Sequence, residues 1–163
     1  MVVKSTEAAT PRKLELPYLG FFLGLRVNEL VMERAWNAGF HGVRESHGYV
    51  IQHLIETDRT ITELARRMEI TQQAASKIVA ELIRLGILET ASAGDKRIKR
   101  IRLSKRGWQC VQLGRWTRAR IEKQLIRSVG KRDYESAKLT VLKCLQELGG
   151  IKRIRTRRIR APQ

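Results

Sequence analysis

The repeat of apolar residues along the chain changes twice, and these two changes limit its fold more than any other feature. Before Gly86 apolar side chains recur at steps of three and four residues, which predicts amphipathic helices. Residues 87–90 and 98–103 look instead like two strands, clearest in the alternation of residues 100–103, around a turn at Gly94 and Asp95. The helical repeat returns from Ser104. We therefore expect a mainly α-helical fold with one small β-hairpin.

Capping and breaking residues set the expected limits of the helices. The predicted helices cover residues 17–38, 46–58, 62–68, 71–85, 104–129 and 133–148. The predicted N-caps are Ser46, Thr62, Thr71 and Ser104. On the helix over 71–85, the side chains expected to be buried are Ile78, Val79, Leu82, Ile83 and Leu85. Residues 1–16 are expected to form a flexible N-terminal tail, and residues 151–163 a basic C-terminal tail.

Positive charge is concentrated in the second half of the chain. The 163 residues include 33 Lys and Arg and 16 Asp and Glu, which gives a net charge of +17. Residues 1–90 hold 11 basic and 11 acidic residues, so residues 91–163 carry the whole excess. Such asymmetry predicts a polyanionic partner, either nucleic acid or an acidic membrane surface.

Several other classes of function find no support in the sequence. No apolar run is long enough to span a membrane, and no membrane partner is expected. No Ser/His/Asp set, paired carboxylates or phosphate loop is visible, so we expect neither an enzyme nor a cofactor. The histidines at 41, 47 and 53 are spaced poorly for a shared metal. Cys110 and Cys144 are expected to pack within helices, which fits a reducing, cytoplasmic location.

The order of elements over residues 46–107 predicts a winged helix-turn-helix. In that motif the second helix of the pair enters a major groove, and the tip of the hairpin reaches the backbone or the minor groove. A Gln amide can bond adenine bidentately, and an Arg suits a narrow minor groove. The predicted DNA-contacting residues are Thr71, Gln72, Gln73, Ser76, Lys77, Asp95, Lys96, Arg97 and Lys99.

Five segments of this region together follow the pattern of a known family. They are Thr62–Met68, Ile70–Val79, Glu81–Leu88, Gly94–Arg97 and Ile101–Gly107. The chain resembles the MarR family, the bacterial regulators named for multiple antibiotic resistance, over about residues 46–107. Ser104 stands where the family usually has Thr, and Thr90 stands where many members have an Arg that contacts the DNA backbone.

The resemblance implies a MarR-type domain over residues 17–150 and a homodimer on double-stranded DNA. Helices within 17–40 and 108–148 would interlock the two chains, and the recognition helices would meet successive major grooves of a pseudo-palindromic operator. Repression by covering a promoter is the family's commonest mode. The resemblance also assigns a minor-groove contact to Arg97, with Asp95 orienting it.

A small-molecule effector is a further candidate partner of such a regulator. The candidate pocket residues are Tyr18, Phe22, Trp36 and His47, although the aromatic residues among them suit a dimer core equally well. Two other classes of protein remain open. The charge of +17 also suits a nonspecific architectural protein of the nucleoid, and the fold also suits a winged-helix protein-interaction module.

Overall fold

The computed structural model describes residues 11–91 and 99–151, which form six helices and a two-stranded hairpin. A short 3-10 turn at Pro11–Lys13 precedes them. The elements are α1 (Leu16–Asn37), α2 (Glu45–Leu54), α3 (Ile61–Met68), α4 (Gln72–Arg84), β1 (Leu88–Ala91), β2 (Arg100–Leu103), α5 (Lys105–Val129) and α6 (Lys131–Glu147). The predicted mainly α-helical fold with one hairpin is confirmed.

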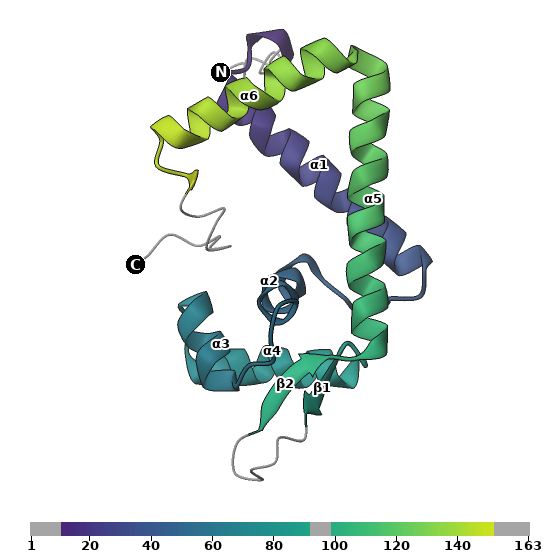
Figure 1. The fold of residues 1–163 in the computed structure, drawn as a ribbon, viewed down its shortest axis with the longest axis vertical. Coiled ribbons are helices and arrows are strands. Elements are labelled where there is room, and N and C mark those ends of the chain that lie inside the picture. The colour runs from purple at the N-terminus through teal and green to yellow at the C-terminus, as the bar shows by residue number, and fades with distance from the viewer. Residues whose placement is uncertain (1–10, 92–98, 152–163) are drawn as a thin grey trace, which may run out of the picture.

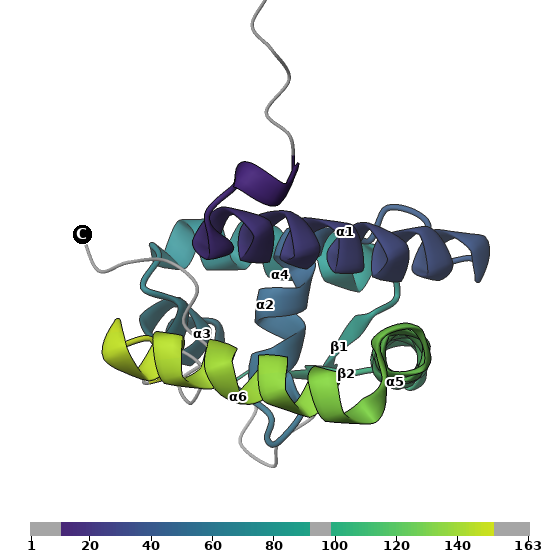
Figure 2. The same ribbon diagram turned by 90° about the horizontal axis from the view of Figure 1, so that it is seen from above.

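The long helix α5 connects two parts of the molecule (Figure 1). At its N-terminal end it joins the hairpin, which lies beside α2, α3 and α4. At its C-terminal end it meets α6 at a steep angle. Helix α1 packs across α5, and seen from above the N-terminal part of α1 extends toward the same side of α5 as α6 does (Figure 2). No described helix is both long and apolar enough to cross a membrane.

The hydrophobic core lies between α2, α3, α4 and the hairpin. Leu64, Leu82, Ile87, Leu88 and Ile101 are almost completely buried there. The C-terminal half of α1 and the start of α5 close this core with Val31, Ala35 and Val111. Helix α6, in contrast, has no buried residue, and the first half of α1 has none either.

The hairpin is antiparallel, with Leu88 opposite Leu103 and Thr90 opposite Ile101. Arg59 adds an isolated bridge on the other side of β2, because its backbone N–H and C=O both bond Ile101 at 3.1 and 2.7 Å. This bridge needs extended backbone before α3. It explains why α2 ends at Leu54 and not near Asp58, as the sequence suggested.

The capping residues are partly those predicted. Thr71 and Ser104 are confirmed as N-caps, accepting bonds from the backbone N–H of Ala74 and Gly107. The predictions of Thr62 and Ser46 were wrong. Thr60 caps α3, because its side chain and that of Glu63 bond each other's backbone N–H at 3.1 and 2.7 Å. The N-cap of α2 is Arg44.

Candidate nucleic-acid interface

The turn between α3 and α4 presents α4 at the surface of the core. Glu69 adopts a left-handed conformation (φ 56°) that closes α3. The next residue, Ile70, donates its backbone N–H to the carbonyl of Ala65 at 3.1 Å. The chain can therefore reverse within a few residues, and the two helices pack as a helix-turn-helix.

Helix α4 has two different faces. Ala75, Val79 and Leu82 are buried against the core. The opposite face carries the exposed side chains of Gln72, Gln73, Ser76 and Lys77, which form two adjacent rows because residues four apart lie above one another. The structure thus brings together all four residues predicted for this face. Ile83 was wrongly predicted as buried; it lies one residue beyond Leu82, turned away from the core, and is 39% exposed.

The N-terminus of α4 lies at the same surface. The hydroxyl of Thr71 accepts the backbone N–H of Ala74 at 3.1 Å, so this N–H is satisfied within the protein. The first N–H groups of a helix lack intrahelical partners and carry the positive end of the helix dipole. This end of α4 therefore suits a phosphate oxygen.

Only part of the predicted wing contact lies in the described residues. Asp95, Lys96 and Arg97 fall outside them, whereas Lys99 is described and exposed. Two arginines of β2 are held within the fold. Arg102 pairs with Glu89 at 2.8 Å, and Arg100 bonds the carbonyl of Asp58 at 3.1 Å.

Two exposed arginines that sequence reasoning did not select, Arg66 and Arg67, lie on the last turn of α3. The signal that could have found them was the pair of cations directly before the turn into α4. Cations at the C-terminus of a helix are also favoured by the helix dipole, so this position has a structural explanation too.

A polar cluster connects α4 to the start of α2. The guanidinium of Arg44 pairs with the carboxylate of Glu81 on α4. Buried His47 lies between them, with Nε2 3.4 Å from the Glu81 carboxylate and Nδ1 accepting the Arg44 backbone N–H at 3.2 Å. Burial lowers the pKa of His47. Desolvation acts to raise the pKa of Glu81, but the charge of Arg44 and the bonds to both neighbours lower it overall.

The four candidate effector residues do not form one pocket in this chain. Tyr18 and Phe22 contact each other edge to face on exposed α1, with ring centroids 5.0 Å apart. The Trp36 indole donates to the carbonyl of Val43 at 2.9 Å, and His47 belongs to the cluster with Glu81. Their grouping into one effector pocket, which the sequence placed beside the dimer helices, stays a prediction.

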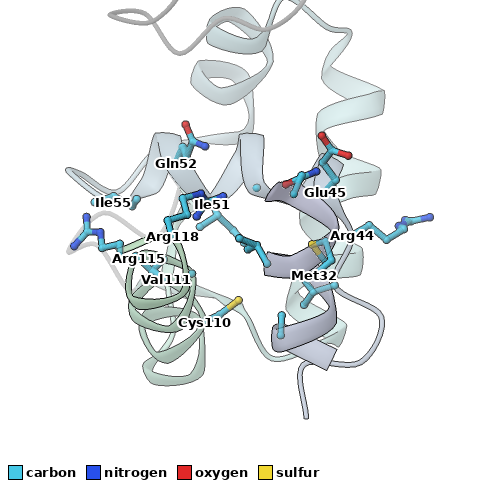
Figure 3. A pocket seen from close by; sticks show the side chains of 16 residues that line it. Met32, Arg44, Glu45, Ile51, Gln52, Ile55, Cys110, Val111, Arg115 and Arg118 are labelled. Carbon is cyan, nitrogen blue, oxygen red and sulfur yellow. The ribbon is translucent and has the colours of Figure 1, made fainter. Parts of the chain in front are cut away.

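A cavity of about 350 Å³ lies instead between α1, α2 and α5 (Figure 3). Its apolar walls include Met32, Ile51 and Val111, and Arg115 and Arg118 border it from α5. Cys110 also lines it and, as predicted, packs partly buried against the core; burial raises the pKa of its thiol. Cys144 differs from prediction, because it is exposed on α6. No group of three or more potential metal ligands occurs among the described residues.

These elements define the class of protein. A helix-turn-helix with an exposed polar second helix, followed by a hairpin, is a winged helix-turn-helix. Residues 41–98 match the family model described as MarR family. The match covers residues 41–98 of the 163, and the helix-turn-helix and strands described within and beside that stretch have the fold that such a match predicts.

Solved structures with this fold include MarR-family regulators. MepR, a transcription regulator of the Staphylococcus aureus multidrug efflux pump MepA, is 17% identical with a TM-score of 0.65, covering 83% of this chain and 99% of MepR. MepR in complex with DNA is 19% identical with a TM-score of 0.66, covering 81% and 98%. A MarR family protein from Bacillus stearothermophilus is 21% identical with a TM-score of 0.65, covering 87% and 99%. A comparison with curated proteins yields no match.

Proposed function

We propose that the chain is a sequence-specific transcription regulator, and not an enzyme, that binds a pseudo-palindromic operator in double-stranded DNA as a homodimer. The observation that carries this proposal is the face of α4. Gln72, Gln73, Ser76 and Lys77 are exposed together, while Ala75 and Val79 hold the helix against the core. Amide and hydroxyl groups on an exposed helix of this class suit the edges of bases in a major groove.

The distribution of charge supports separate roles for two parts of the chain, one contacting bases and the other contacting phosphates. Helix α4, the proposed recognition helix, lies in the half with no net charge. Its contacts to bases would therefore add less of the charge attraction that is equal for all sequences. The excess of +17 lies in residues 91–163 and would supply contacts to phosphates, including those of the predicted wing residues Lys96, Arg97 and Lys99. Phosphate contacts position a protein on DNA, whereas base contacts give it specificity.

The proposal of a homodimer rests on apolar surface that the single chain leaves uncovered. On α1, Phe21 and Leu23 are 57% and 55% exposed; on α6, Leu139 is 58% exposed. A monomer rarely exposes so many large apolar side chains on neighbouring helices. Pairing α1 and α6 with the same helices of a second chain would bury them in a symmetric interface.

Repression is the mode of regulation that we propose, by a dimer that covers a promoter in the cytoplasm of a bacterium. A small-molecule effector would release the DNA by favouring a dimer with differently spaced recognition helices. MepR has been crystallised bound to ethidium, which is a cation. The cavity in this chain is bordered by Arg115 and Arg118, which have no ion pair among the described residues, and by one carboxylate, that of Glu45. Because the two arginines outnumber this carboxylate, we propose an anionic effector with an apolar body.

The test is selection of bound sequences from random double-stranded DNA by the full chain, followed by footprinting and light scattering. We expect one palindromic motif, two protected half-sites about one helical turn apart and the mass of a dimer. The charge of +17 also favours a nonspecific architectural protein, which would instead select no motif and coat the DNA uniformly. A protein-interaction module would retain no DNA. Either of these results would refute the proposal.

A further inference from the structure

The polar cluster between α2 and α4 has a position that matters for DNA recognition. Glu81 lies four residues after Lys77 and eight after Gln73, so these three side chains form one row along α4. Whatever holds Glu81 therefore fixes the direction in which Gln73 and Lys77 point. The partners of Glu81 are Arg44 and His47, which belong to α2 and its N-cap.

The apolar contacts of α4 fix this direction less well. Ala75, Val79 and Leu82 pack against the core, but hydrophobic contact has no preferred direction and tolerates small rotations. Charge-assisted hydrogen bonds are short and directional. The pair between Arg44 and Glu81 is the ion pair that joins α4 to another element among the described residues.

Buried His47 contacts both members of this ion pair and helps to fix their positions. It is only 1% exposed, and its Nδ1 accepts the backbone N–H of Arg44, which places the ring proton of neutral His47 on Nε2. Nε2 faces the carboxylate of Glu81 at 3.4 Å. The ring thus holds the Arg44 backbone on one side and faces Glu81 on the other, so the carboxylate has a defined place.

We propose that Arg44, Glu81 and His47 are positioning residues for DNA recognition: they set the rotation of α4 and thereby the bases that Gln72 and Gln73 can reach, without touching DNA themselves. This inference rests on the proposed function. A mainly stabilising role is a poor alternative, because the side chain of Arg44 is 61% exposed and ion pairs at the surface contribute little to stability.

The experiment compares the wild type with Glu81→Gln, Arg44→Gln and the charge-exchanged double variant Arg44→Glu/Glu81→Arg. Affinity is measured for the selected operator and for each single-base variant of it, together with the melting temperature and the salt dependence. The matched control is Glu33→Gln, which removes an exposed ion pair to Arg26 on α1. Hydrogen exchange of α4 is followed in the protein without DNA.

We expect Glu81→Gln and Arg44→Gln to reduce discrimination between bases at least about threefold, with faster exchange in α4 and an unchanged salt slope. The double variant should recover at least half of the lost discrimination, and Glu33→Gln should behave as the wild type. Unchanged discrimination in the single variants, or equal loss in the double variant, overturns the proposal. If the wild-type protein does not discriminate between bases, the proposed function as a sequence-specific regulator is refuted. Hydrogen exchange of α4 without DNA still tests the positioning role in that case.

Discussion

Gly107, on the first turn of α5, has almost no room for a side chain. A Cβ added there would overlap the carbonyl oxygen of Ile87 and lie 3.2 Å from its carbonyl carbon and 3.1 Å from a methyl of Leu103. The obstacle is backbone, and the same carbonyl accepts the backbone N–H of Ser104 at 3.0 Å. Relief would require α5 to move by about 1 Å to reach ordinary contact distance. Gly107→Ala therefore strains the junction between α5 and the hairpin.

The expected cost in stability follows from two destabilising effects and one stabilising effect. Overpacking of a tight site costs about 1–3 kcal/mol, and loss of the Ser104 bond costs about 1 kcal/mol more. Ala favours helix over Gly by about 1 kcal/mol. The net destabilisation is about 2 kcal/mol, or roughly 4–8 °C in melting temperature for a chain of this length.

Scanning calorimetry at one fixed protein concentration measures this change, because a dimer melts at a temperature that depends on concentration. Gly114→Ala is the matched control in the same helix. Its Cβ would meet only the end of the Arg118 side chain at 3.2 Å, so helix propensity should leave stability equal or slightly higher. If Gly107→Ala melts with or above this control, the argument from close approach is wrong.

Four other predictions test separate parts of the proposals. Gln73→Ala should relax preference at particular bases, whereas Arg97→Ala should weaken binding to all sequences alike and reduce the salt slope; identical profiles would contradict the assigned roles. Leu142→Glu should convert the dimer to a monomer in light scattering, and a dimer that persists would contradict an interface through α6. Because the pKa of His47 is lowered in the fold, the unfolded chain binds a proton first as pH falls. Its contribution to stability should thus be complete above about pH 6.5 and be lost in more acidic solution, and His47→Gln should flatten this dependence of melting temperature on pH. For the cavity, calorimetry should show 1-naphthoate binding at least about tenfold more tightly than neutral 1-naphthamide, with the difference abolished by Arg118→Gln; equal binding would refute an anionic effector.

Local chemistry explains which predictions from sequence succeeded. Thr71 and Ser104 cap their helices through atoms only three residues away, so the sequence contains all that such a cap needs. The cap at Thr60 is also local, since Thr60 and Glu63 have capping-box spacing, but Thr62 offers a second capping side chain two residues later. The face of α4 that carries Gln73 was predictable because one strong periodicity separates it from the core.

Features that depend on how distant elements meet were not predictable from residue spacing. The bridge of Arg59 to β2 shortens α2, although the two segments are over forty residues apart. The cavity depends on the crossing of α1 over α5, and the contact of Arg44 with Glu81 joins residues 37 apart. No local pattern specifies such meetings, because each depends on the packing of the whole core.

The close contact at Gly107 fixes the N-terminal end of α5 against the hairpin, so a change in the direction of α5 mainly moves its C-terminal end. The helix has 25 residues, which at about 1.5 Å each gives an arm of roughly 37 Å. If α5 tilts by about 10° about its N-terminal end, its C-terminal end, where α6 begins, moves by roughly 6 Å. In the proposed symmetric dimer both α5 helices would tilt together. A small shift at the interface between the chains would then change the distance between the two α4 helices, which must match a DNA repeat of about 34 Å. In the proposed dimer, a ligand could therefore change the spacing of the recognition helices while each winged helix keeps its internal structure.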